Sequence, residues 1–140
     1  MRKNGSTVLA LLLALSMGLS ACNSYGGLAG TRWVVVSYGP AQAQAPVGAG
    51  IATSFQFQTD GTYNWIFGCN LVSGNYRVSG DSLVFTQTSS TGKACLGDYQ
   101  MQEAFGLKFL TGQVHYVQAD KTLTLSSAGG DELVLTYSTR

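Results

Sequence analysis

The chain has 140 residues, of which 45% are hydrophobic and 11% are charged. This length fits one domain, and the apolar content is too high for a disordered chain. A formal net charge of +1 excludes the strongly basic surface of a typical nucleic-acid-binding protein. No apolar run reaches the about 20 residues that cross a bilayer as a helix. Composition therefore indicates one compact domain and leaves its activity open.

The N-terminus has the parts of a secretory signal peptide. Arg2 and Lys3 supply positive charge, residues 8–15 are apolar, and small residues follow. Residues 19–22, Leu-Ser-Ala-Cys, resemble a bacterial lipobox, in which a peptidase cleaves before a lipidated cysteine. The pattern thus predicts that Cys22 is the lipidated first residue of the mature protein. The alternative is a plain signal peptide in which the cysteine is a coincidence.

Lipidation at Cys22 would anchor the protein to a membrane, because each buried methylene contributes about 0.8 kcal/mol and two or three acyl chains hold a protein essentially permanently. The predicted organisation is a lipoprotein signal peptide over 1–21, a lipidated tether over 22–27 and one domain over 28–140. Asn23 is not the aspartate that often retains lipoproteins at an inner membrane. In a cell with two membranes, we therefore expect an outer-membrane lipoprotein that faces the periplasm.

The part of the chain after the tether predicts a mostly β domain. Short runs of alternating apolar and polar residues recur about every ten residues, separated by turn signals such as Asp60-Gly61. This spacing is typical of an antiparallel barrel or sandwich. The predicted strands cover residues 32–38, 54–58, 62–67, 76–78, 83–85, 114–117, 123–125 and 133–137, and a predicted loop covers 39–50.

One segment, near residues 98–111, has helical periodicity instead. Its apolar residues recur at i, i+4 and i+8, at Met101, Phe105 and Phe109. Asp98 can cap the start of the helix, and Gly106 lowers its propensity by about 1 kcal/mol. We expect one amphipathic helix that lays this aromatic face over the open side of the barrel.

The two cysteines of the predicted domain indicate a structural bond. Cys69 and Cys95 form an even pair in a chain with an export signal, and such a pair most simply forms a disulfide. The rival interpretation is a reactive thiol pair or a metal site. Metal sites usually gather further Cys or His ligands at close spacing, and neither cysteine has such a neighbour in the sequence. A C-x-x-C motif is also absent, so we predict no metal and no cofactor.

The sequence offers no catalytic constellation. His115, the one histidine, alternates with apolar strand residues, which predicts a solvated strand position. The motifs G-x-S-x-G, G-x-G-x-x-G and H-E-x-x-H do not occur. Several acids fall in predicted turns, where aspartate is favoured for backbone reasons: Asp60, Asp81, Asp120 and Asp131. We predict a non-enzymatic protein, and a glycosidase-type acid pair stays open as an alternative.

Several short motifs occur in a fixed order along residues 28–137. They are Leu28-Ala29-Gly30-Thr31-Arg32-Trp33, Phe55 and Phe57 before Asp60-Gly61, Gly68-Cys69-Asn70 with Gly74 and Tyr76, Thr91 four residues before Cys95, Glu103 with Phe105 and Leu110, and Leu123, Leu125, Leu133 and Leu135. Their order resembles the META domain family, and within it lipoproteins related to the heat-shock protein HslJ. The sequence departs from the family at the bulky segment 63–67, where the family often has small residues.

The resemblance implies a compact β domain with one helix, in bacterial envelope proteins associated with stress and antibiotic tolerance. It transfers no catalytic residues. Three polar motif residues, Asn70, Thr91 and Glu103, could converge near Cys69 and Cys95 and form a binding site. The alternative is that Asn70 bonds the local turn through its side chain and Glu103 is a solvated or locally paired carboxylate.

We therefore expect a monomeric, lipid-anchored envelope protein that acts by binding a protein or a small ligand. A near-neutral mature surface, with six basic and seven acidic residues, gives no reason to expect a nucleic acid or another polyanion as partner. The first alternative is a pilotin-like or chaperone-like protein that holds a hydrophobic peptide or acyl chain in an apolar cavity under the helix. The second alternative is an envelope hydrolase.

Overall fold

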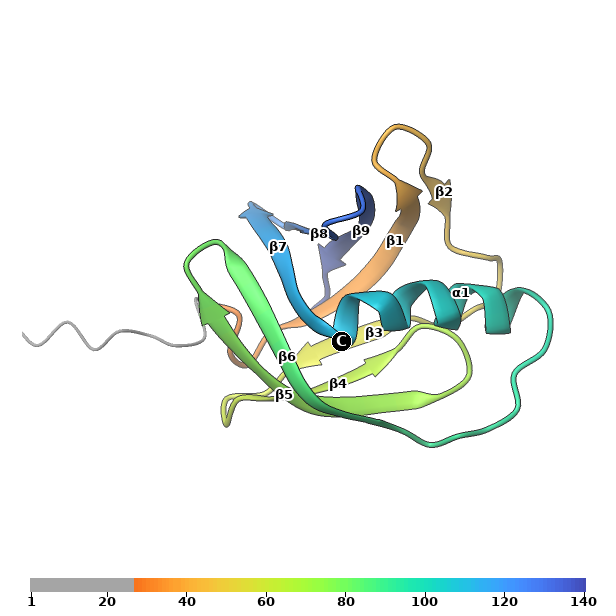
Figure 1. The fold of residues 1–140 in the computed structure, drawn as a ribbon, viewed down its shortest axis with the longest axis horizontal. Coiled ribbons are helices and arrows are strands. Elements are labelled where there is room, and N and C mark those ends of the chain that lie inside the picture. Colours follow the sequence, from red (N-terminus) through yellow and green to blue (C-terminus); the bar gives the residue numbers. More distant parts are fainter. Residues whose placement is uncertain (1–26) are drawn as a thin grey trace, which may run out of the picture.

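The computed structural model describes residues 27–140, so the predicted signal peptide, Cys22 and most of the predicted tether lie outside the described residues. Eight antiparallel strands form a closed barrel, shown in Figure 1, in which the first strand also pairs with the last. The barrel strands are β1 (Arg32–Pro40), β3 (Ser54–Phe57), β4 (Thr62–Ile66), β5 (Leu71–Ser79), β6 (Ser82–Ser90), β7 (Gly112–Ala119), β8 (Thr122–Ser126) and β9 (Asp131–Tyr137). The prediction of a mostly β domain is confirmed, and of its two forms the barrel is the correct one.

The predicted loop over residues 39–50 contains more strand than expected. Strand β1 continues to Pro40 because its end pairs with β9, where Gly39 faces Glu132 and Pro40 faces Asp131. A two-residue strand, β2 (Ala45–Pro46), then returns along β1. Proline is tolerated at both places because they are a strand end and a sheet edge.

Alternating side chains of the strands fill the barrel. Phe55 and Phe57 on β3 share one buried face, as predicted, and so do Tyr63 and Trp65 on β4 with Phe67 just after it. Phe55 lies at the centre of this cluster, with its ring centroid between 4.5 and 5.9 Å from four other aromatic rings. Interdigitated rings of this kind leave the core packed with side chains.

The predicted helix exists as α1 (Asp98–Leu107), followed by a turn of 3-10 helix, η1 (Lys108–Leu110). In Figure 1, α1 crosses the barrel between β2 on one side and β4 and β5 on the other. Asp98 does not cap it. The N-cap is Gly97, whose φ of 59° only glycine adopts readily, and no side chain bonds the first turn.

The predicted aromatic face of the helix is confirmed at Phe105 and Phe109, which pack against the core, and is wrong at Met101. Met101 is 66% exposed, and Phe105 is only partly buried, so of the three predicted residues Phe109 alone is fully buried. The side of α1 that faces the barrel carries Gln102 and Glu103. Because the barrel rim beneath α1 offers backbone amides and carbonyls, polar side chains are favoured on this face of the helix.

Gly106 explains how the helix comes so close to the barrel. A Cβ atom at this position would lie 2.4 Å from Cδ1 of Phe67 and 2.6 Å from Cη2 of Trp65. The residue that lowers helix propensity therefore permits direct packing of the α1 backbone on two core rings. Within residues 27–140, no helix has the length and apolar character needed to cross a membrane.

Candidate functional site

The carboxylate of Glu103 is the centre of a polar cluster where α1 meets the turn between β4 and β5. Its Oε2 atom accepts hydrogen bonds from the backbone N–H groups of Cys69, at 2.9 Å, and Asn70, at 2.7 Å. Its Oε1 atom accepts a further bond of 2.7 Å from Nδ2 of Asn70. Glu103 is buried, and such bonds from amides to a carboxylate are among the stronger hydrogen bonds in proteins.

The side chain of Asn70 joins this turn to the segment 91–97 between β6 and α1. Its Oδ1 accepts bonds from Thr91 Oγ1, at 2.7 Å, and from the Lys93 backbone N–H, at 2.6 Å. Its Nδ2 also donates to the Lys93 carbonyl, at 3.1 Å. The alternative, a side chain that bonds the local turn, does not describe these bonds, because the partners lie 21 to 33 residues away.

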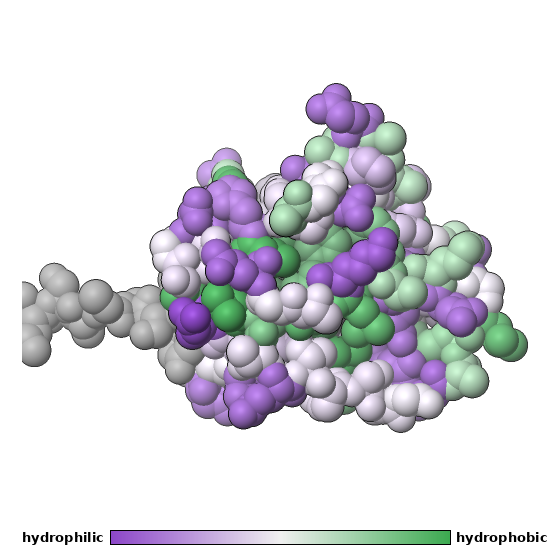
Figure 2. Space-filling model, viewed as in Figure 1, coloured by the Kyte–Doolittle hydropathy of each residue, from purple (hydrophilic) through white to green (hydrophobic). Residues whose placement is uncertain are grey.

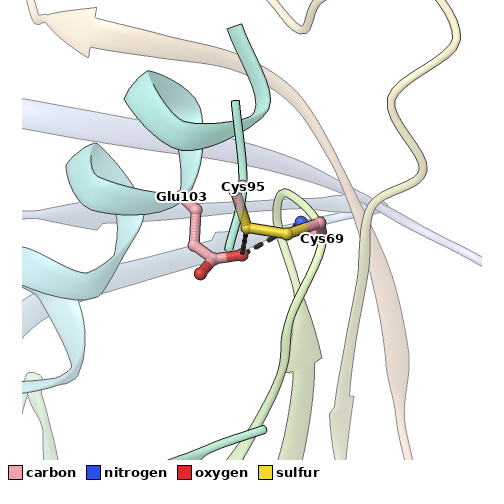
Figure 3. Close-up of side chains that lie close together, drawn as sticks. All are labelled: Cys69, Cys95 and Glu103. Carbon is pink, nitrogen blue, oxygen red and sulfur yellow. Dashed lines mark hydrogen bonds between the residues drawn. A yellow bond between two sulfur atoms is a disulfide. The ribbon is translucent and has the colours of Figure 1, made fainter. Parts of the chain in front are cut away.

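The structure joins Cys69 and Cys95 by a disulfide, with Cα atoms 6.0 Å apart. Figure 3 shows Glu103 reaching from the helix toward this bridge, and its Oε2 lies 3.6 Å from Sγ of Cys95. The Nδ2 atom of Asn70 lies 3.2 Å from the same sulfur. The structure thus brings all three predicted binding residues, Asn70, Thr91 and Glu103, together beside the bridge.

Gly68 permits this arrangement through close approach. A Cβ atom at Gly68 would lie 2.6 Å from Cβ of Glu103 and 2.8 Å from the carbonyl oxygen of Tyr99. Any larger residue would push α1 away from the turn and separate the Glu103 carboxylate from its amide donors. The glycine of the G-C-N motif therefore positions the buried acid.

A depression of about 470 Å³ opens beside the bridge, between α1 and the segment 91–97. Its lining residues are Lys93, Ala94, Cys95, Leu96, Gln100, Glu103, Ala104 and Leu107. Of the apolar residues that line it, Leu96 is 82% exposed to solvent. In Figure 2 the corresponding end of the molecule, on the right, carries several apolar residues at its surface.

This surface lies far from the start of the described chain. In Figure 1 the orange start of the described chain lies toward the left, and the segment that leads from β6 into α1 lies at the right end. The described chain therefore begins at the end of the domain opposite to the depression. We call the depression, with exposed Leu96 at its edge, the distal surface.

The other predicted residues lie outside this cluster. His115 on β7 is about half exposed and contacts Asp81 through Nδ1, at 3.3 Å. Asp81 and Asp120 line a second open depression together with Tyr116 and Gln118. Asp60 accepts two hydrogen bonds from Thr62, which lower the pKa of its exposed carboxyl group. This is the local backbone role that aspartate takes in turns.

Two residues of the polar cluster were missed by sequence reasoning. Gln102 is fully buried, accepts a bond from the Gly48 N–H at 3.1 Å and donates to the Phe67 carbonyl at 3.4 Å. Lys93 contributes its backbone, whose N–H and carbonyl both bond Asn70. A glutamine next to Glu103 in a helix gives no signal of burial, and a backbone contribution has no sequence signal at all.

The architecture agrees with solved structures of low sequence identity. An NMR structure of a protein from Burkholderia xenovorans is 24% identical, with a TM-score of 0.68, and the match covers 81% of this chain and 85% of that chain. A second NMR structure is 20% identical, with a TM-score of 0.64 over 78% and 90% of the two chains. At these identities the likeness concerns the fold alone.

A more distant neighbour is the crystal structure of a DUF4847 family protein from Bacteroides vulgatus ATCC 8482. It is 13% identical, with a TM-score of 0.56, and the match covers 81% of this chain and 96% of that chain. No curated protein matches the chain. The META domain model matches residues 26–139. Because this match spans far more than half of the sequence, the chain belongs to the META domain family.

Proposed function

We propose that this protein is a non-enzymatic, lipid-anchored protein of the cell envelope that binds a protein or a small ligand at the distal surface. Lipidation at Cys22 would fix the domain to a membrane, facing the periplasm in a cell with two membranes. The resemblance to envelope META-domain lipoproteins supports a role in stress or antibiotic tolerance. The observation that carries the binding site is the buried Asn70–Glu103 network beside a depression that exposed Leu96 lines.

The distal surface combines rigidity with exposed apolar area. Hydrogen bonds from Asn70 and the disulfide hold segment 91–97 against the turn between β4 and β5. A surface that is already ordered loses little entropy when a partner binds. Exposed apolar side chains with a polar rim are typical of interaction sites. The distal surface has both properties.

The pilotin-like alternative needs an apolar cavity under the helix. That space is occupied: the rings of Trp65 and Phe67 pack directly against Gly106, and Tyr38 contacts both Phe67 and Phe105, with ring centroids 5.4 and 5.1 Å apart. A peptide or acyl chain could enter only if these rings moved. Binding on the outside of the barrel is therefore favoured over binding inside it.

The hydrolase alternative needs acids in an enclosed cleft. Asp81 and Asp120 do line one depression, but Asp81 is 78% exposed at its side chain and the depression is wide open. A glycosidase-type general acid works from an apolar environment. Glu103 is buried, and both of its oxygens accept hydrogen bonds that hold the fold together. These features support a binding role.

Site-specific photo-crosslinking in the native cell envelope tests the binding surface. We would place a photoreactive residue at Leu96 on the distal surface and, as a matched control, at Val117 on β7, which is also exposed. We expect a defined cross-linked species from position 96 and none from 117. An Ala104→Trp substitution, which fills the depression from an exposed helix position, should abolish it.

Two outcomes of this experiment would contradict the proposed binding surface. Equal cross-linking from positions 96 and 117, or cross-linking at 96 that the Ala104→Trp variant leaves unchanged, would contradict the distal surface as the binding site. Circular dichroism of the Ala104→Trp variant should show the barrel signal of the wild type. If the cross-linked species contains a second copy of this chain, the surface binds another copy of the protein and not a different partner.

A further inference from the structure

The three groups at the bridge have the composition and spacing of metal ligands. The Sγ atoms of Cys69 and Cys95 and a carboxylate oxygen of Glu103 all lie within 4.8 Å of one another. In the disulfide the sulfurs are not thiolates and cannot hold a cation. Reduction of the bridge would leave two thiols and one carboxylate at the same place.

The geometry of this triad matches one edge of a zinc tetrahedron. With Zn–S distances of about 2.3 Å and Zn–O distances of about 2.0 Å, a tetrahedral site has a sulfur–oxygen separation of about 3.5 Å and a sulfur–sulfur separation of about 3.8 Å. The distance from Cys95 Sγ to Glu103 Oε2 is already 3.6 Å. The two sulfurs must separate, and Cys69 Sγ, which lies within 4.8 Å of the carboxylate, must keep or approach the about 3.5 Å of a ligand pair. Cys95 lies on a segment without regular secondary structure, which allows it to move.

Access and orientation also fit a metal site. The depression at the distal surface is lined by Cys95 and Glu103, so an ion and a water molecule can reach the fourth coordination position from solvent. The Asn70 side chain bonds Oε1 of Glu103 and fixes the direction of the carboxylate. Hydrogen bonds of this kind orient ligating carboxylates in metal sites. Oε2 accepts the backbone N–H groups of Cys69 and Asn70, so a cation bound at Oε2 would take the place of one of these bonds.

Charge makes a cation the natural occupant of the reduced site. Two thiolates and one carboxylate would place three negative charges within 4.8 Å of one another. Thiolate and carboxylate ligands together suit a borderline-soft divalent ion. We propose that the reduced protein binds one zinc ion through Cys69, Cys95 and Glu103, and that disulfide formation closes the site. This inference is independent of the proposed partner-binding function.

A dithiol is the reductant that would open the bridge. The dithiol gives two electrons and two protons to the bridge and becomes a disulfide itself, while Cys69 and Cys95 become thiols. Zinc then displaces the two thiol protons, which are released to solvent. Oxidation of the two thiolates by a disulfide oxidant removes both sulfur ligands and releases the ion.

Zinc titration of the oxidised and the reduced mature protein tests this site. The bridge is reduced with a phosphine, which is removed under inert gas so that it does not compete for zinc. Native mass spectrometry gives the stoichiometry, and competition with a chromophoric chelator gives the affinity. We expect one zinc per reduced chain, none per oxidised chain, and none in the Cys69→Ser/Cys95→Ser variant.

A pair of carboxylate variants separates coordination from general charge. Glu103→Gln should weaken zinc binding about tenfold or more, whereas Asp98→Asn, which removes an exposed carboxylate from the same helix, should leave the affinity unchanged. Equal affinities of the two variants would overturn Glu103 as a ligand. Zinc on the oxidised chain, or none on the reduced chain, would overturn the site.

X-ray absorption of the zinc-loaded wild type identifies the zinc ligands even if the Glu103→Gln variant does not fold. The proposal requires two sulfur scatterers at about 2.3 Å together with oxygen scatterers at about 2.0 Å. Far-UV circular dichroism of the reduced, zinc-loaded protein should retain the β-barrel signal. A shell of four sulfurs, which requires two chains per ion, or loss of the barrel signal would contradict this site.

Discussion

Asn70 holds the carboxylate of Glu103 with two hydrogen bonds of 2.7 Å, one from its backbone N–H to Oε2 and one from its side-chain Nδ2 to Oε1. One residue of the β4–β5 turn therefore satisfies both oxygens of a buried acid on α1. The opposite atom of the same side chain, Oδ1, holds Thr91 and Lys93. Three segments that are distant in sequence meet at this one asparagine.

Replacing Asn70 with aspartate should destabilise the fold strongly at neutral pH. The substitution exchanges the donor Nδ2 for a carboxylate oxygen that faces Glu103, and the two acids cannot both stay ionised at hydrogen-bond distance. We expect a loss of about 3 kcal/mol in the free energy of unfolding, measured by chemical denaturation. The deficit should shrink at acidic pH, because a proton shared between the two carboxyl groups restores a donor.

Asn64→Asp is the matched control for this variant. Asn64 lies on β4 with its side chain on the outer face of the barrel, so the same chemical change should alter stability by less than about 0.5 kcal/mol. Equal losses in the two variants would mean that the bonds of Asn70 to Glu103 contribute nothing specific.

Gly106→Ala should destabilise the protein even though alanine is the better helix former. The gain in helix propensity is about 1 kcal/mol, but the new Cβ would collide with the Phe67 and Trp65 rings. Overpacking of this kind costs about 1–3 kcal/mol, so we expect a net loss in thermal unfolding experiments. In the reverse control, Ala104→Gly at an exposed position of α1, only the propensity term of about 1 kcal/mol should be lost. A stabilised Gly106→Ala variant would show that the helix does not pack so closely.

Reduction of the Cys69–Cys95 bridge should lower stability without abolishing the barrel. The bridge closes a loop with a sequence separation of 26 residues, which on loop-closure entropy stabilises the fold by about 3.5 kcal/mol. Denaturation with and without reductant, in the absence of metal ions, measures this difference. An unchanged transition midpoint would contradict a formed disulfide in the oxidised protein.

Because the Tyr63 hydroxyl group is buried, we expect the folded protein to lose stability at alkaline pH. Burial raises its pKa, and its OH donates to Thr88 Oγ1, at 2.8 Å, since Thr88 gives its own proton to the Leu110 carbonyl. A raised pKa in the folded state means that the stabilisation is complete below the unfolded value of about 10 and is lost as pH rises through the folded value. Tyr63→Phe should show a smaller alkaline loss of stability than the wild type. Identical pH profiles of the two proteins between about pH 9 and 12 would contradict this assignment.

The barrel could be predicted from the sequence because its strands are short, local patterns. Alternation at Phe55 and Phe57 and the turn pair Asp60-Gly61 report burial and chain reversal within a few residues. The helix could also be located, since its periodicity is local too. The face of the helix could not, because burial of Glu103 depends on amides that lie 33 and 34 residues away.

The candidate site was predictable only through the resemblance to a family. Proximity of Asn70, Thr91 and Glu103 has no local signal, because these residues come from the β4–β5 turn, the segment after β6 and α1. The glycines at positions 68 and 106 show the same limit. From the sequence, Gly68 indicates backbone freedom and Gly106 a weak point in a helix. In the structure, both glycines let α1 approach the barrel closely.

The intact mass of the protein purified from its own membranes, with and without reduction and thiol alkylation, tests the central claim of a lipid-anchored envelope protein. We predict a mass equal to residues 22–140 plus acyl chains, with Cys69 and Cys95 alkylated only after reduction. A mass without lipid would contradict the membrane anchor at Cys22. Two thiols alkylated without reductant would contradict the disulfide on which the distal surface depends.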